Sequence, residues 1–215
     1  MTGVIFDLDG TLLDTLEDLL DATNYALNVY GFPERTLEEM RRFVGNGALN
    51  QIRLSLPQGT GEEMVQRVLD IYRPYYARHC QIKTKPYKGI PQALAEIGKK
   101  YPVAIVSNKP DLAVKPLCQQ YFPGIYALGE TAGVPRKPAA DMVYKAMEAI
   151  GVETCVYVGD IEVDVLTAKN AAVPCLSVLW GFRDEKVLRD AGAEAMCREP
   201  AQLMDAIEKL VKERF

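Results

Sequence analysis

Short apolar runs alternate with amphipathic stretches along most of the chain. The first run, Val4 to Phe6, is continuous, which is typical of a strand buried on both faces of a parallel sheet. Further strands are expected at 103–106, 125–128, 155–158, 175–179 and 195–197, and helices at 90–100, 112–121, 140–150, 163–171, 186–190 and 201–212. This alternation predicts an α/β fold, a doubly wound parallel sheet with a Rossmann-like arrangement of helices on both faces.

A block of helical periodicity without a convincing strand separates the first strand from the others. Asp14 with Glu17 resembles a capping box at its first helix, and Thr36 with Glu39 resembles another at its second. Two further helices are expected over 48–56 and 62–79. We therefore expect a discontinuous α/β core formed by residues 1–13 and 83–215, and an inserted α-helical cap domain at 14–82 that acts as a lid.

Composition narrows the class of protein and its partners. Of the 215 residues, 48% are hydrophobic and 25% are charged, which is ordinary for a globular protein. The net charge of −4 argues against a nucleic-acid partner, because no basic patch is available to bind phosphates. No apolar run approaches the roughly 18 residues of a membrane helix, and no export signal is visible. We expect no membrane partner.

Cysteine and histidine usage excludes several kinds of site. The five cysteines are widely spaced and never form C-x-x-C, which fits reduced thiols and a cytoplasmic protein. The single histidine, His79, precedes Cys80, but Pro86 stands where a cysteine phosphatase needs its arginine. His79 is therefore expected simply to end a helix.

Polar residues follow the predicted strands where each strand ends. Asp7 and Asp9 are two positions apart, so their side chains leave an extended chain on the same side, and Gly10 permits a sharp turn after them. Because the carboxyl ends of parallel strands meet at one edge of the sheet, we expect a single site there. The side chains predicted to meet in it are Asp7, Asp9, Ser107, Asn108, Lys137, Asp160 and Asp164.

These residue types suit the transfer of a phosphoryl group. Clustered carboxylates repel one another, and a hard cation such as Mg²⁺ relieves that repulsion while binding a phosphate oxygen. Lys137 adds a positive charge, and Ser107 adds a neutral donor. A carboxylate nucleophile can take the phosphoryl group as an aspartyl phosphate, while the second carboxylate acts as acid and then as base.

Four motifs occur in a fixed order: Asp7-Leu-Asp-Gly-Thr11, Ser107-Asn108, Lys137-Pro138, and Gly159-Asp160 with Asp164. In these motifs the chain resembles the haloacid dehalogenase-like phosphatases. Gly45-Asn46-Gly47 and Trp180-Gly-Phe-Arg183 further resemble the phosphoglycolate phosphatase branch of that superfamily. Ile161 departs from the pattern, since relatives often have a small hydroxyl residue there and an isoleucine side chain cannot cap the next helix.

The resemblance implies a role for each matched residue. Asp7 is expected to be the nucleophile, and Asp9 the acid and base. The implied Mg²⁺ ligands are Asp7, Asp9 (through its backbone carbonyl), Asp160 and Asp164, and the implied phosphate ligands are Thr11, Ser107, Asn108 and Lys137. Asn46 and Arg53 are candidates for contacts between the cap and the rest of the substrate, although loop geometry and a solvated helix face explain them equally well.

We therefore expect a Mg²⁺-dependent phosphatase of a small phosphorylated metabolite, with 2-phosphoglycolate favoured, that works as a monomer or weak homodimer. Another small phosphate ester or inorganic pyrophosphate is the main alternative. A phosphoglucomutase or a receiver-like phosphoacceptor domain is disfavoured, the latter because a receiver needs no helical insertion.

Overall fold

The computed structural model describes residues 1–214, which form two compact units. The first, which we call the core unit, consists of Met1–Asp14 and the described residues from Pro86 onward. The second, the helical unit, is Thr15–Lys85. These boundaries lie one and three residues beyond the expected ends at 13 and 82.

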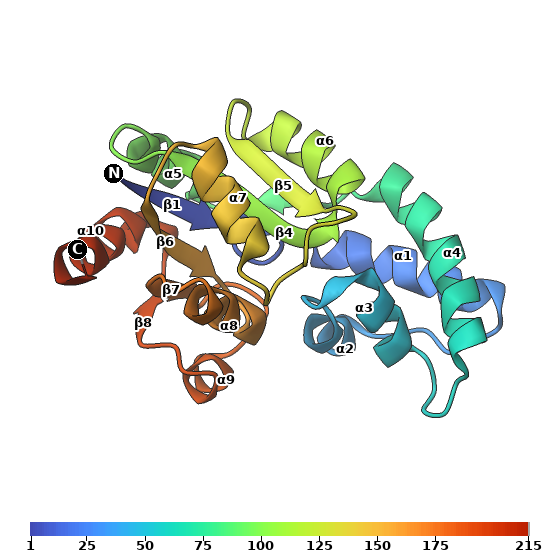
Figure 1. Cartoon of the computed structure of the whole chain (residues 1–215). Helices are drawn as coiled ribbons and strands as arrows, with labels where there is room; N and C mark the ends of the chain where they lie inside the picture. Colours follow the sequence, from blue (N-terminus) through green and yellow to red (C-terminus); the bar gives the residue numbers. More distant parts are fainter. Residues whose placement is uncertain (215) are drawn as a thin grey trace. The chain divides into compact units, whose positions relative to one another are not determined.

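A parallel sheet forms the centre of the core unit (Figure 1). Within the described residues its strands are β1 (Thr2–Phe6), β4 (Val103–Pro110), β5 (Tyr126–Glu130), β6 (Thr154–Gly159), β7 (Cys175–Val178) and β8 (Ala195–Cys197). Their order is β5-β4-β1-β6-β7-β8, with every neighbouring pair parallel. The predicted doubly wound α/β fold is thus confirmed, and β1 lies centrally between β4 and β6.

Helices cover both faces of this sheet because successive strand residues point to opposite sides. Val4 and Phe6 pack with one set of helices, and Ile5 packs with the other. The first set is α5 (Ile90–Gly98), α6 (Asp111–Tyr121) and α10 (Leu203–Arg214). The second set is α7 (Asp141–Ala149) and α8 (Glu162–Asn170), with α9 (Glu185–Asp190) beside α8.

The helical unit contains α1 (Leu16–Val29), α2 (Leu37–Phe43), α3 (Gly47–Ser55) and α4 (Glu62–His79). The capping box predicted at α2 is present: Glu39 N donates to Thr36 Oγ1, and Thr36 N donates to a Glu39 carboxylate oxygen. His79 is the last residue of α4, where its Nδ1 lies 2.7 Å from the carbonyl of Tyr75. It therefore ends a helix, as expected.

The capping box predicted for Asp14 and Glu17 is wrong. Helix α1 begins at Leu16 with Thr15 as its N-cap and no side-chain cap. Asp14 lies instead in β2 (Leu13–Asp14), which forms a two-stranded sheet with β3 (Lys85–Pro86). Because α1 begins only at Leu16, the N-cap position falls on Thr15, and Asp14 before it is part of strand β2.

Among the described residues, no helix is both long enough and apolar enough to cross a bilayer.

Candidate active site

The carboxyl ends of β1 and β6 fix the position of Asp7. Asp7 directly follows β1, and its backbone N–H donates to the carbonyl of Val158 at 2.8 Å, which continues the pairing with β6. The chain then reverses at Gly10, whose φ of 90° is in the left-handed region that glycine adopts without strain. This turn exposes the end of β1 to the residues that follow its neighbouring strands.

Lys137 lies between two of the carboxylates. Its Nζ is 2.6 Å from Asp7 Oδ1 and 2.8 Å from Asp164 Oδ1, and only 1% of the residue is exposed. Asn108, in β4, donates from Nδ2 to the carbonyl of Lys137 at 3.0 Å. A side chain of the second predicted motif therefore positions the lysine of the third.

Asp160 lies in a tight cradle of donors and glycines. Its Oδ1 accepts from Thr11 Oγ1 at 2.8 Å, and its Oδ2 accepts from the backbone N–H of Phe182 at 2.7 Å. A Cβ added at Gly10 would lie 2.2 Å from Asp160 Oδ2, and one at Gly181 would lie 2.3 Å from it. Only glycine fits at these two positions while the carboxylate keeps its place.

Asp164 accepts a hydrogen bond from four donors. Its Oδ2 accepts from the backbone N–H groups of Asp160 and Ile161, each at 3.1 Å, so Asp164 supplies the N3 half of a capping box at helix α8, whose N-cap Ile161 makes no side-chain cap. Its Oδ1 accepts from Lys137 and, at 3.1 Å, from the hydroxyl of Tyr157. Asp164 is thereby held rigidly against the end of β6.

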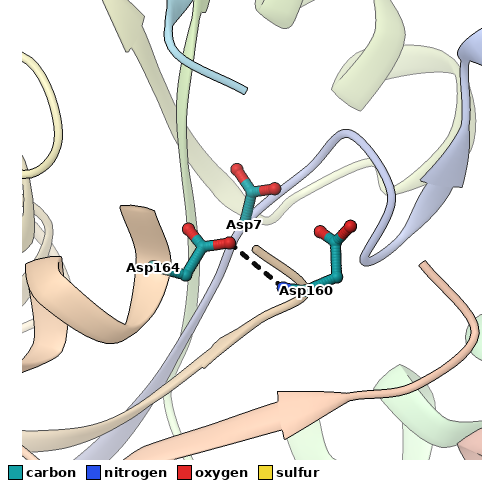
Figure 2. Close-up of side chains that lie close together, drawn as sticks. All are labelled: Asp7, Asp160 and Asp164. Carbon is teal, nitrogen blue, oxygen red and sulfur yellow. Dashed lines mark hydrogen bonds between the residues drawn. The ribbon is translucent and has the colours of Figure 1, made fainter. Parts of the chain in front are cut away.

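Asp7, Asp160 and Asp164 form one buried acidic cluster. Each offers a carboxylate oxygen, and these oxygens all lie within 4.8 Å of one another. Figure 2 shows the three carboxylates gathered where β1 and β6 end and α8 begins. Hard oxygen donors at such spacing fit a divalent cation such as Mg²⁺.

The electrostatics of the cluster also favour a cation. Burial, followed by repulsion from Asp164, raises the pKa of Asp160 to about 7. Burial likewise raises the pKa of Asp7 well above its usual range, although Lys137 opposes the shift. Burial disfavours the charge of Lys137, but Asp164 and Asp7 outweigh it and hold the pKa of the ammonium well above its usual value. The cluster is therefore short of positive charge, which a divalent cation would supply.

Strand β4 supplies two donors to Asp9. Lys109 Nζ is 2.5 Å from Asp9 Oδ1, and Ser107 Oγ is 3.4 Å from Asp9 Oδ2. Ser107 and Lys109 are two residues apart in the strand, so both point to the side on which Asp9 lies. The Asp9 carboxylate is thus approached by one donor at each oxygen.

The core unit contains all the predicted site residues except Asn46 and Arg53. Those two belong to the helical unit, where Asn46 is the exposed N-cap of α3 without a side-chain cap. Arg53 forms an ion pair with Glu62 at 2.8 Å. Within the core unit, the hydroxyl of Thr11 is directed at Asp160, a contact not expected from its predicted role as a phosphate ligand.

Three contacts at the site were missed by the sequence interpretation. Lys109 contacts Asp9, Tyr157 contacts Asp164, and Trp180 Nε1 donates to the carbonyl of Thr11 at 2.9 Å. The two-residue spacing from Ser107 could have indicated Lys109. No local pattern distinguishes the tyrosine or the tryptophan from ordinary packing residues.

The chain is similar to known hydrolases in both sequence and fold. Residues 4–178 match the family model of haloacid dehalogenase-like hydrolases. A phosphoglycolate phosphatase of Pseudomonas syringae pv. tomato is 31% identical over 97% of this chain and 78% of its own, and one of Aquifex aeolicus is 30% identical over 85% and 86%. The crystal structure of a candidate phosphoglycolate phosphatase from Lactobacillus delbrueckii subsp. bulgaricus is 37% identical, with a TM-score of 0.91 over 96% of this chain and 98% of that one.

Proposed function

Because this chain belongs to the haloacid dehalogenase-like hydrolase family, and its relatives indicate a phosphatase, we propose that it is a Mg²⁺-dependent phosphatase. The proposed substrate is a small phosphate monoester, with 2-phosphoglycolate first among them. The names of the curated relatives support this choice of substrate.

The observation that most supports the proposal is the lysine enclosed by the acidic cluster. Lys137 contacts both Asp7 and Asp164, and a third carboxylate, that of Asp160, lies within the same few ångströms. A buried ammonium beside cation-binding carboxylates suits a phosphate dianion held together with its counter-ion.

We assign the direct metal ligands to Asp7 and Asp160, together with the backbone carbonyl of Asp9. Asp164 already accepts four hydrogen bonds, so in this proposal it orients Lys137 and the end of β6 and contacts the ion's water shell. When bound, Mg²⁺ neutralises negative charge on the phosphate oxygens.

In the first step of the proposed reaction, a carboxylate oxygen of Asp7 attacks phosphorus. An aspartyl phosphate forms, and the bond from phosphorus to the ester oxygen breaks. Asp9 donates a proton to the departing oxygen, which leaves as an alcohol. Lys137 restrains Asp7 at 2.6 Å and offers its positive charge to the phosphoryl group.

In the second step, Asp9 takes a proton from water, and the resulting nucleophile attacks the phosphorus of the aspartyl phosphate. Inorganic phosphate leaves, and Asp7 is regenerated as a carboxylate. Ser107, whose hydroxyl is 3.4 Å from Asp9, is proposed to donate to the phosphate as well. The helical unit is proposed to act as a cap, with Asn46 and Arg53 still as candidates for contact with the substrate.

The test is a panel of phosphate monoesters and pyrophosphate, ranked by kcat/KM with Mg²⁺ and again after chelation of the metal. We expect 2-phosphoglycolate to rank first and chelation to stop turnover. Asp7→Asn should abolish turnover because it removes the nucleophile, whereas Asp205→Asn, which changes an exposed aspartate of α10, should not. Undiminished turnover in Asp7→Asn, or activity that survives chelation, would contradict the proposal.

A further inference from the structure

The segment 180–183, between β7 and α9, lies directly against the Asp160 carboxylate. The backbone N–H of Phe182 donates to Asp160 Oδ2 at 2.7 Å, and a Cβ at Gly181 would lie 2.3 Å from the same oxygen. A backbone N–H points wherever its segment holds it. The position of the Asp160 carboxylate therefore depends on the groups that hold this segment in place.

Side chains hold both ends of this segment. At the first end, Trp180 Nε1 donates to the carbonyl of Thr11 at 2.9 Å. The hydroxyl of Thr11 in turn donates to Asp160 Oδ1 at 2.8 Å. At the other end, Arg183 donates to both carboxylate oxygens of Glu162, from Nε at 2.8 Å and from Nη2 at 3.3 Å. Each oxygen of Asp160 thus accepts from a donor that lies next to one of these contacts.

The contact between Arg183 and Glu162 joins the segment to the start of a helix. Two N–H groups on two carboxylate oxygens give an ion pair a defined direction as well as energy. The Arg183 side chain is only 10% exposed and that of Glu162 is 38% exposed, so water screens this pair less than a surface pair. Glu162 is the first residue of α8, and Asp164 of the acidic cluster belongs to the same helical turn. The pair therefore connects the donor of Asp160 to the helix that positions Asp164.

We propose that Arg183 and Glu162 are positioning residues that set the affinity of the acidic cluster for Mg²⁺. Neither is a ligand: their pair holds the Phe182 N–H against Asp160, and that hydrogen bond orients the carboxylate toward the ion. Partners of metal ligands affect metal affinity because they fix the ligand's orientation before the ion arrives. The inference rests on the proposed Mg²⁺-dependent function and specifies which residues outside the cluster determine how tightly the ion binds.

The test is calorimetric titration of the whole protein with Mg²⁺ alone, without substrate. Glu162→Gln and Arg183→Gln should each weaken Mg²⁺ binding about 5-fold, because either change breaks the pair. Glu185→Gln is the matched control. Glu185 forms an ion pair with Arg198 at 2.7 Å and is 33% exposed, close to the exposure of Glu162. This control should change the affinity for Mg²⁺ less than about 2-fold.

The direction of the two effects separates positioning from simple electrostatics. Removing the negative charge of Glu162 would by itself weaken cation binding, whereas removing the positive charge of Arg183 would by itself strengthen it. Positioning instead predicts a loss in both variants. It also predicts that the double variant binds Mg²⁺ about as weakly as either single variant, because one interaction can be lost only once. Opposite effects of the two changes, or losses that multiply in the double variant, would overturn the proposal.

Hydrogen exchange of the Phe182 amide, followed by NMR, tests the same contact in the metal-free protein. In the unaltered protein this amide should exchange at least 10-fold more slowly than that of Lys186, which lies exposed in the first turn of α9. Glu162→Gln should remove most of the difference. A Phe182 amide that exchanges as fast as that of Lys186 in the unaltered protein would overturn the proposal, whether or not any variant folds.

The titration also separates this inference from the proposed function. Unchanged Mg²⁺ affinity in both glutamine variants would overturn the positioning role of Arg183 and Glu162 and leave the Mg²⁺-dependent phosphatase intact. An unaltered protein that does not bind Mg²⁺ would refute the metal dependence and, with it, the positioning role.

Discussion

One hydroxyl group distinguishes Tyr157 from the apolar residues around it. The ring lies in the apolar cluster on one face of the sheet, and the residue is fully buried. Its hydroxyl nevertheless donates to Asp164, and the ammonium of Lys137 is 5.8 Å from the centre of its ring. Tyr157 therefore supports Asp164, a member of the acidic cluster, and Lys137, which restrains Asp7.

Tyr157→Phe should lower kcat about 10-fold, because Asp164 loses one of its four donors and orients Lys137 less well. The free energy of unfolding should change by only about 1 kcal/mol, as for the loss of one hydrogen bond. Steady-state kinetics and thermal unfolding measure the two effects. Tyr144→Phe, at an exposed position of α7, is the control. An unchanged kcat in Tyr157→Phe would contradict the proposal that Tyr157 supports Asp164 and Lys137.

Asp160 links stability to pH in the metal-free protein. Burial and the neighbouring Asp164 raise its pKa from 3.8 to about 7, so the folded state holds a proton that the unfolded state releases. A pKa raised on folding contributes stability that is present at low pH and is lost as pH rises through the folded value.

The melting temperature of the metal-free protein should therefore fall from about pH 4 to pH 7 more steeply than that of Asp160→Asn, which has no proton to release. Added Mg²⁺ should stabilise the unaltered protein more at the upper end of this range, since cation and proton compete for the same oxygens. Scanning calorimetry with and without Mg²⁺ checks both effects. Parallel pH profiles for the two proteins would contradict the assignment.

The geometry of the site depends on the turns that follow the strands. Two glycines in these turns leave the space that the Asp160 carboxylate occupies. Gly10 follows β1 and Gly181 follows β7, and a Cβ at either would collide with the same carboxylate. Strand β4 contributes in another way, because its alternation directs Ser107 and Lys109 to Asp9 and directs Asn108 to the backbone carbonyl of Lys137. Strand geometry and turn geometry together assemble the donors.

Gly181→Ala should weaken Mg²⁺ binding and lower activity at least 10-fold, because the added methyl group would lie 2.3 Å from the Asp160 carboxylate. Gly98→Ala is a matched control: it has open space around it and an ordinary φ, and it should stabilise helix α5 by about 0.5–1 kcal/mol. Calorimetric titration with Mg²⁺ measures the affinity of each variant for the ion. Equal Mg²⁺ affinities in Gly181→Ala and Gly98→Ala would refute the steric argument.

The chain forms two compact units, and the proposed metal site belongs to only one of them. All proposed metal ligands belong to the core unit, and the helical unit has its own buried core between α1 and α4, with a buried hydrogen bond from Gln51 to Thr23. Each unit thus has its own source of stability.

Mg²⁺ alone should slow amide hydrogen exchange around Asp7, Lys137 and the 159–164 segment, because it binds the folded core unit there. Exchange in helices α1 to α4 should be unchanged. Mass spectrometry of peptides after exchange measures both regions in one experiment. Protection of the helical unit by the metal alone would contradict the placement of every ligand in the core unit.

The alternation of apolar runs and helical stripes was enough to predict the α/β fold, since a strand buried on both faces and an amphipathic helix are local patterns. The ends of those strands also indicated the acidic residues and Lys137, because parallel strands bring their carboxyl ends to one edge. The prediction failed at Asp14, where the local sequence fits a helix cap equally well. Pairing of β2 with the distant strand β3 placed this residue in a strand instead.

Only the folded chain decided which polar group contacts which. Thr11 and Asp160 are 149 positions apart, Asp7 and Lys137 are 130 apart, and Asp9 and Lys109 are 100 apart. Hydrogen-bond partners depend on distances of a few tenths of an ångström, and side-chain spacing along the sequence does not contain that information. The second lysine and the glycine cradle therefore emerged only once the strands were set side by side.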